Sequence, residues 1–180
     1  MPSRSLMSTY GCAGIFAIVL ISSGITLARN SDWRNGTSLW VAATAQSPGK
    51  ARVFYNAGVY FHQQLQLDAA LHYYSKAIEL DPQKVEAFVN RGNLHDEQHR
   101  PGKASEDYDR ALTIEPNNAN ARYNRGVLYE RLGVLNAAAA DYRESCIQGR
   151  PTGFRKGCES WERLSRTIME SGSPTGSRRQ

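Results

Sequence analysis

The chain has 180 residues, a formal net charge of +5 at pH 7 and three cysteines. This length is enough for one compact unit with extensions at its ends. The positive excess gathers near the two ends, and no basic stripe with interleaved aromatic residues occurs, which argues against a nucleic-acid partner. The cysteines, Cys12, Cys146 and Cys158, are too few and too scattered for a metal cluster or a dense disulfide framework.

The first segment, residues 1–29, contains a long uncharged run. Residues 5–28 carry no charged side chain. At about 1.5 Å per residue, a helix of this length crosses a hydrocarbon core of about 30 Å. We favour a single membrane-spanning helix that stays in the protein. The alternative is a cleaved signal peptide, with Thr26-Leu27-Ala28 as a loose cleavage site.

Residues 30–50 are predicted to form a linker and a short helix. The helix is expected from about Arg34 to Ala45, with Asp32 as its N-cap. Asn35 begins an Asn-Gly-Thr sequon, which predicts N-glycosylation if the chain is exported. A simple polar turn is the alternative.

The central part divides into three segments of about 34 residues, 51–84, 85–118 and 119–152. The same kinds of residue recur in the same columns of each segment. The columns are a large residue (Phe54, Phe88, and Tyr123 one place late), a glycine (Gly58, Gly92, Gly126), a ring (Phe61, His95, Tyr129), an alanine (Ala70, Ala104, Ala138), a tyrosine (Tyr74, Tyr108, Tyr142), a small residue (Ala77, Ala111, Ser145) and a closing proline (Pro82, Pro116, and Pro151 one place late).

Physical chemistry gives each column a role in a helical hairpin. The glycine allows the second helix to approach the first, and the alanine and tyrosine fill that contact at i, i+4 spacing. The proline ends the second helix, because it lacks an N–H and disfavours helix before it. We expect first helices at 51–64, 85–98 and 119–132, and second helices at 67–80, 102–114 and 135–147.

These columns resemble the tetratricopeptide repeat (TPR) family. The resemblance implies an all-α fold, an α-solenoid of three helix-turn-helix repeats whose concave face grips a peptide or a partner protein. Terminal repeats need caps that hide their apolar surface. We expect the helix near residues 34–45 to cap the first repeat and a helix at Phe154–Met169, within residues 153–170, to cap the third. Residues 171–180 are predicted to be a disordered tail.

Two cysteines fall in helices that this arrangement would pack together. Cys146 lies near the end of the last repeat helix, and Cys158 lies early in the closing helix. In an oxidising compartment a disulfide would join the two helices, and two free, half-buried thiols are the alternative. The sequence alone does not decide between the disulfide and the two free thiols.

The column two places before the glycine holds an asparagine in every repeat: Asn56, Asn90 and Asn124. This row resembles the asparagine ladder of the O-GlcNAc transferase repeats, which holds peptide backbone. An amide side chain offers both a donor and an acceptor, so it can pair with any peptide group. Helix-to-helix hydrogen bonding within the solenoid is the alternative role. The other partner-binding residues expected on this face are Arg52, Tyr55, Val59, His62, Val89, Asn93, Asn120, Tyr123, Val127 and Arg131.

The predicted groove carries Tyr, His and Arg at one end, acids in the middle and Arg at the far end. It lacks the lysine/arginine/asparagine carboxylate clamp of the chaperone-binding TPR proteins, because the matching columns hold Tyr55, Val59 and Asn120, and only Asn90 fits. His95 and His99 are four residues apart, but Asp96 follows the first histidine where a zinc protease motif needs glutamate, so we expect packing and no metal ion.

A second resemblance concerns the run from Arg29 to Gly58, with its Trp33, Leu39-Trp40 and Ser47-Pro48. It is similar to the junction between the last membrane span and the repeats in the transmembrane-and-TPR O-mannosyltransferase-like proteins and their bacterial relatives. The catalytic portion of those proteins, a multi-span segment, is missing from this sequence.

We therefore predict a membrane-anchored TPR scaffold that binds a protein or peptide partner in its concave groove. The expected location is a membrane, with a single pass and extracytoplasmic repeats. We expect no enzyme activity, no cofactor and no small-molecule substrate, because no nucleophile–base pair, phosphate loop or carboxylate pair is visible. The alternative is an accessory or truncated part of a multi-span glycosyltransferase-type protein that presents acceptor polypeptide to a catalytic subunit.

Overall fold

The computed structural model describes residues 36–152 and 154–172, which form eight α-helices and one short 3₁₀ helix. The chain divides into a first unit, Met1–Pro48, and a second unit, Gly49–Gln180. In the first unit the structure describes one helix, α2 (Gly36–Gln46), close to the predicted 34–45. Its role as a cap stays a prediction.

The predicted membrane segment at 1–29 and the glycosylation site at Asn35 lie outside the described residues, as does most of the predicted tail. Within residues 36–152 and 154–172, no helix has both the length and the apolar character needed to cross a membrane.

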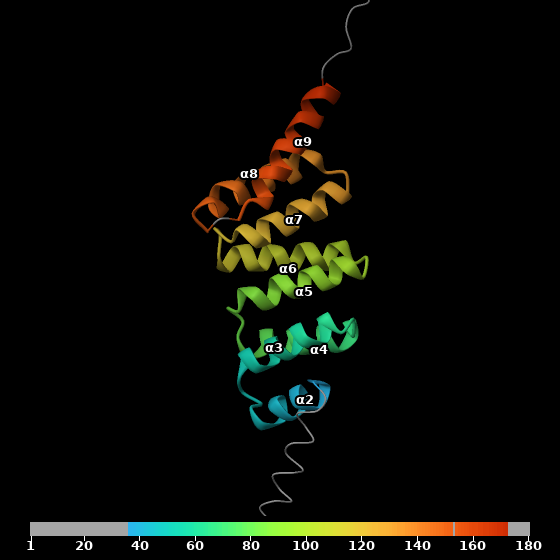
Figure 1. Cartoon of the computed structure of the whole chain (residues 1–180), viewed down its shortest axis with the longest axis vertical. Coiled ribbons are helices and arrows are strands. Elements are labelled where there is room, and N and C mark those ends of the chain that lie inside the picture. The colour runs from blue at the N-terminus through green and yellow to red at the C-terminus, as the bar shows by residue number, and fades with distance from the viewer. Residues whose placement is uncertain (1–35, 153, 173–180) are drawn as a thin grey trace, which may run out of the picture. The chain divides into compact units, whose positions relative to one another are not determined.

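The second unit consists of three helical hairpins followed by a closing helix (Figure 1). The hairpins follow one another in chain order, with α4 packed against α5 and α6 against α7. Each helix begins and ends within about two residues of its predicted bounds. The helices are α3 (Ala51–Gln63), α4 (Leu67–Leu80), α5 (Val85–Glu97), α6 (Pro101–Ile114), α7 (Ala119–Arg131) and α8 (Leu135–Gly149).

The glycine, alanine and tyrosine columns form the contact inside each hairpin, as predicted. The three alanines and three tyrosines are at most 2% exposed. A Cβ atom on the glycine would lie 2.6 Å from the ring of Tyr74 in the first repeat, 2.7 Å from Tyr108 in the second and 2.9 Å from Tyr142 in the third. Only a glycine leaves room for the ring, so this column sets how closely the two helices approach.

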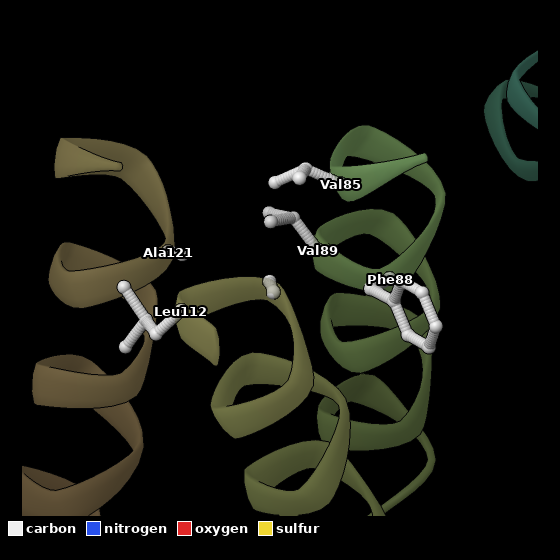
Figure 2. Packing of buried hydrophobic residues seen from close by; sticks show 6 residues of the cluster. Val85, Phe88, Val89, Leu112 and Ala121 are labelled. Atoms are coloured by element: carbon white, nitrogen blue, oxygen red, sulfur yellow. The ribbon is translucent and has the colours of Figure 1, made fainter. Parts of the chain in front are cut away.

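Apolar side chains also join successive hairpins. Figure 2 shows one such cluster, in which Val85, Phe88 and Val89 of α5 lie near Leu112 of α6 and Ala121 of α7. All five are 9% exposed or less. Burying a side chain of the size of valine, leucine or phenylalanine stabilises a fold by about 1.5–3 kcal/mol. A single hairpin lacks this surface, which is why the repeats stabilise one another.

The last hairpin is covered by α9 (Lys156–Gly172), which the 3₁₀ turn Arg150–Thr152 precedes. Leu164 of α9 is buried against Ala138 and Tyr142 of α8, with Trp161 and Ile168 packed beside it. This confirms the predicted closing helix, although it begins two residues later than expected.

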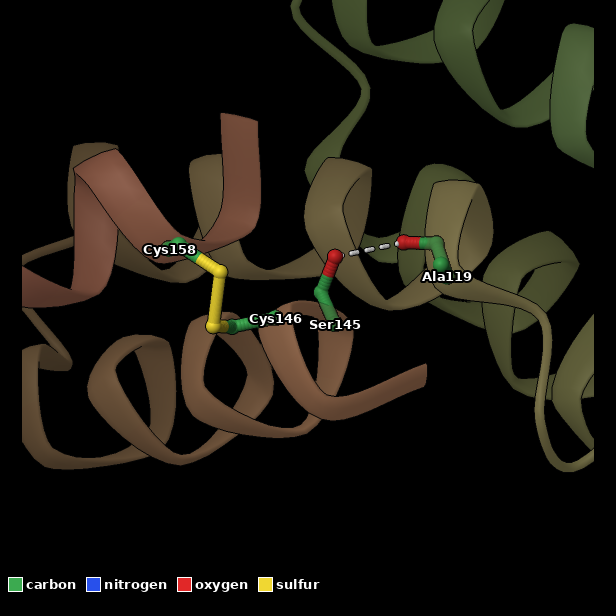
Figure 3. Close-up of a disulfide and its surroundings, with 4 residues drawn as sticks. All are labelled: Ala119, Ser145, Cys146 and Cys158. Atoms are coloured by element: carbon green, nitrogen blue, oxygen red, sulfur yellow. Dashed lines mark hydrogen bonds between the residues drawn. A yellow bond between two sulfur atoms is a disulfide. The ribbon is translucent and has the colours of Figure 1, made fainter. Parts of the chain in front are cut away.

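A disulfide joins α8 to α9 through Cys146 and Cys158, whose Cα atoms are 4.4 Å apart (Figure 3). Beside it, a Cβ atom on Gly157 would lie 2.6 Å from Ser145 Oγ, so Gly157 allows this close approach. Ser145 Oγ in turn donates a hydrogen bond to the Ala119 carbonyl oxygen at 2.8 Å, which ties α8 to the start of α7.

Candidate functional site

The first helices of the repeats share one face of the second unit. α3 and α5 have Cα atoms within 8 Å of each other, as do α5 and α7, whereas the second helices α4 and α6, both fully described, do not. The first helices are therefore the more closely spaced set and form the inner, concave side of the stack. We call this side the groove.

A pocket of about 310 Å³ lies in the groove, and asparagine dominates its lining. Side chains of α3, α5 and α7 contribute to it together. The lining residues are Tyr55, Glu86, Val89, Asn90, Asn93, Asn118, Asn120 and Asn124. Six of the predicted partner-binding residues thus surround one hollow. Asn118 was missed, because it is the N-cap of α7, where its Oδ1 accepts from the Ala121 N–H, and it precedes the columns that were compared.

A second pocket, of about 390 Å³, adjoins the same asparagine column. Its lining residues are Val59, His62, Gln63, Leu65, Tyr74, Asn90 and Glu97. Asn90, the middle asparagine of the predicted ladder, lines both pockets, so the two pockets meet there. Leu65 was also missed, since it stands in the turn after α3 and not on the helix face that the repeat columns define.

The ladder asparagines make hydrogen bonds within the solenoid and still keep an acceptor. Asn90 Nδ2 donates to the Tyr55 hydroxyl at 3.1 Å, and Asn124 Nδ2 donates to Asn93 Oδ1 at 2.9 Å. The carbonyl oxygen Oδ1 of Asn90 and of Asn124 has no hydrogen-bond partner among the described residues. Asn56 is exposed. At Asn90 and Asn124, hydrogen bonding within the solenoid therefore does not exclude partner binding. Partner binding stays a prediction.

The tyrosine column supports the floor of the groove. The Tyr108 hydroxyl donates to Asn93 Oδ1 at 2.8 Å, the same oxygen that accepts from Asn124. The Tyr74 hydroxyl lies 3.5 Å from His62 Nδ1. Burial raises the pKa of both phenols. These hydroxyls remain protonated and act as hydrogen-bonding groups.

Two acidic side chains of the second repeat bond to side chains of the neighbouring repeats. His62 Nε2 lies 2.8 Å from Glu97 Oε2, and Arg131 bonds to Asp96. Lys84 Nζ lies 3.3 Å from Glu86 Oε2. The sequence predicted acids in the middle of the groove with Tyr, His and Arg at one end and Arg at the other, and the structure joins two of these acids to His62 and Arg131.

The remaining predicted binding residues take several positions. Arg52 is exposed, and Val127 is 38% exposed. Tyr123 packs its ring against Tyr142 and Phe154, with centroids 5.7 Å apart in both contacts. Tyr123 therefore serves the junction with the closing segment, and the structure does not bring it into either pocket described above.

An ion pair inside the second and third hairpins was not predicted. The Arg91 guanidinium donates two bonds to the Asp107 carboxylate, at 2.9 and 2.7 Å, and Arg125 does the same to Asp141, both at 2.7 Å. Each arginine also reaches the preceding second helix, Arg91 to Ser75 at 3.2 Å and Arg125 to Asp109 at 2.6 Å. The signal was present, since these residues recur at the repeat spacing.

His95 is buried beside this ion pair, as its ring column predicts. It is 7% exposed, and burial lowers its pKa, which favours the neutral ring. His99 lies instead in the turn after α5, with a φ of +57°. Within the described residues there is no group of three or more histidine, cysteine or acidic side chains able to hold a metal ion.

Comparison with known proteins agrees with this architecture. A sequence model described as "Tetratricopeptide repeat" matches residues 51–84, and one described as "TPR repeat" matches residues 102–133. A search of curated protein sequences gives no match. None of these findings supports the resemblance of residues 29–58 to the junction of multi-span membrane proteins.

Solved structures share the fold. The TPR domain of Arabidopsis OM64 is 24% identical with a TM-score of 0.61, covering 66% of this chain and 96% of its own. The first TPR of Spaghetti (RPAP3), bound to the HSP90 peptide SRMEEVD, is 22% identical with a TM-score of 0.61, covering 67% and 94%. The Sgt2 TPR domain from Aspergillus fumigatus is 17% identical with a TM-score of 0.63, covering 72% and 86%. This chain therefore carries tetratricopeptide repeats, folded as an all-helical solenoid.

Proposed function

We propose that this chain is a scaffold that binds an extended segment of a protein partner in the groove of α3, α5 and α7. The observation that carries the proposal is the concentration of amide side chains around one pocket. Asn90 and Asn124 there keep a carbonyl oxygen for a peptide N–H. Amides bind peptide backbone whatever its side chains, which suits a scaffold.

The charges narrow the class of partner. A structural neighbour holds an acidic HSP90 peptide, which supports the idea that this fold accommodates peptides. In the present groove the basic side chains His62, Lys84 and Arg131 already pair with acids. Together with the missing clamp columns, this favours an internal, weakly charged segment over an acidic C-terminus. The groove offers amides and paired charges, so we propose a binding role without catalysis.

We also propose that residues 5–28 anchor the scaffold in a membrane, with the repeats on the periplasmic or lumenal side. The uncharged run supports an anchor, and the Cys146–Cys158 disulfide suits an oxidising compartment. Carbonate extraction, protease protection and thiol labelling of the full-length chain test this. We expect a membrane-bound chain with protected repeats and both cysteines oxidised. A soluble chain that begins near Arg29 would replace the anchored scaffold with a secreted one.

The groove is tested with an array of short peptides of random sequence and the full-length chain in detergent. The double variant Asn90→Ala/Asn124→Ala should lose at least about tenfold in affinity for the peptides that the unchanged chain binds, the equivalent of about 1.4 kcal/mol. The control is Asn136→Ala, an exposed asparagine of α8 on a second helix. Equal binding by all three chains, with equal melting temperatures, would leave the ladder a purely structural feature.

A further inference from the structure

The turn between α3 and α4 holds a large apolar side chain in an unfavourable position. Leu65 is 81% exposed. Its φ of +57° lies in the left-handed region that residues with a Cβ atom avoid. The third repeat has Gly133 at the matching position, with a φ of +76°. A glycine adopts this turn more easily, so the folding of the hairpin does not explain the leucine.

The second pocket gives Leu65 a role. Leu65 lines that pocket together with Val59 and Tyr74, which supply its apolar surface. The two other ionisable side chains in the lining, His62 and Glu97, bond to each other, with His62 Nε2 2.8 Å from Glu97 Oε2, so these polar groups are already engaged. Functional sites often retain a costly backbone conformation when the side chain is needed there. The pocket therefore suits an uncharged, apolar group.

Asn90 connects this pocket to the asparagine-lined one, because it lines both. Successive side chains of an extended peptide point to opposite sides. A peptide whose backbone bonds to Asn90 Oδ1 can therefore direct one side chain toward the first pocket and its neighbour toward the second. The first pocket contacts it mainly with amides, and the second with Val59, Leu65 and Tyr74.

We propose that the second pocket binds one large apolar side chain of the partner peptide, of the leucine, isoleucine, methionine or phenylalanine class, and that Leu65 determines this specificity. The proposal rests on the peptide-binding function proposed above and adds a side-chain preference to it. The ligand class is an extended, weakly charged peptide with a large apolar residue next to the peptide group that Asn90 holds.

Selection from a displayed library of random peptides by the full-length chain in detergent tests this preference. We expect the recovered peptides to share one apolar position, and replacing that residue by serine to weaken binding about tenfold. In Leu65→Gly the same replacement should weaken binding clearly less, because the exposed part of the apolar wall is lost and only Val59 and Tyr74 remain. Leu65→Gly should nevertheless have a higher melting temperature, since glycine relieves the turn.

His99→Gly is the matched control. It relieves the same backbone conformation in the second repeat, at a residue that does not line the second pocket. It should raise the melting temperature and leave the apolar preference intact.

The outcomes separate the two proposals. Leu65→Gly with an undiminished apolar preference overturns the specificity role. Peptides that need Asn90 but share no apolar position overturn the pocket assignment and leave the groove function standing. Recovery of no peptide by the unchanged chain overturns both.

Discussion

The first repeat differs from the other two at the centre of its hairpin. In the second repeat Arg91 and Asp107 form a two-bond ion pair. The matching residues of the first repeat are Ala57 and Tyr73. Tyr73 stacks on Phe61, with centroids 4.9 Å apart and planes 8° apart, and also contacts Phe54. The same space is therefore filled by an ion pair in one hairpin and by stacked rings in the other.

This difference separates the repeat columns that keep one residue type in every hairpin from the columns that accept different residue types. Glycine, alanine and tyrosine are kept in all three hairpins, because the tyrosine ring lies directly on the glycine backbone. The arginine and aspartate columns accept either an ion pair or packed aromatic rings. A buried ion pair and a well-packed apolar group of similar volume often stabilise a fold to a similar extent.

Breaking the ion pair without replacing it should have the largest effect. Asp107→Ala leaves the Arg91 guanidinium, 22% exposed, without its partner inside the hairpin. Loss of one member of a buried pair costs about 3–4 kcal/mol. Urea unfolding followed by circular dichroism measures this change in the free energy of unfolding.

Introducing the residue types of the first repeat into the second repeat provides the control. The triple variant Arg91→Ala/His95→Phe/Asp107→Tyr gives the second repeat the residues of Ala57, Phe61 and Tyr73. Phe88 already matches Phe54. We expect most of the lost stability to return, to within about 1–2 kcal/mol of the unchanged chain. A triple variant as unstable as Asp107→Ala would show that the two solutions are not interchangeable.

The glycine column should behave alike in both kinds of repeat. Gly58→Ala and Gly92→Ala place a Cβ atom 2.6 and 2.7 Å from the rings of Tyr74 and Tyr108. Overpacking of this kind costs about 2–3 kcal/mol, seen as a lower urea midpoint. Gly102→Ala in α6 is the control, since no atom lies within 4 Å of its Cβ. It should stabilise α6 by about 0.5–1 kcal/mol. A large cost at Gly92 with none at Gly58 would mean that the ion pair, and not the column, determines the spacing.

Two substitutions in the turns between the helices of a hairpin should change stability by smaller amounts and in opposite directions. His99 has a φ of +57° and Gly133 a φ of +76°. Exchanging the residue types in this left-handed conformation, by His99→Gly and Gly133→Ala, should stabilise and destabilise the chain respectively, each by about 1 kcal/mol. Melting curves measure both. Equal shifts in the same direction would contradict the assignment of strain to these positions.

The repeat columns predicted the hairpins because they record contacts within each hairpin. The tyrosine on the glycine, the alanine beside it and the proline after the second helix all act over one hairpin, so a period of about 34 residues reveals them. The bounds of α3 to α8 followed within about two residues and those of α9 within three. Asn90 and Asn124 were found because asparagine recurs with the same period, although their hydrogen bonds run between repeats, to Tyr55 and Asn93.

Contacts that depend on side-chain direction were not predictable in this way. Arg91 and Asp107 recur at the repeat spacing, but the recurrence alone does not say that they meet, which depends on how α5 and α6 are rotated. Leu65 enters the second pocket from a turn that the columns leave out. The pairing of His62 with Glu97 depends on the spacing between repeats. Each required the packed helices.

The closing helix offers the smallest effect and a dependence on pH. Arg163 of α9 donates two hydrogen bonds to the Glu130 carboxylate, at 2.7 and 2.9 Å. The hydrogen bond from Arg163 lowers the pKa of Glu130 below its ordinary value of 4.5. A lowered pKa in the folded state adds stability that is complete above the unfolded pKa and is lost as the pH falls through the folded one.

Docking of α9 should therefore weaken in acid, by less than about 1 kcal/mol because Arg163 is 58% exposed. Hydrogen exchange of the α9 amides from about pH 6 to about pH 3 measures this as a loss of protection beyond the intrinsic rate change. Glu130→Gln removes the titrating group and should flatten the dependence in α9. α3 and α4 make no contact with α9, so their protection should change little between the two chains. If the acid-induced loss in α9 persists in Glu130→Gln, another group is responsible and Glu130 does not link the third repeat to its cap.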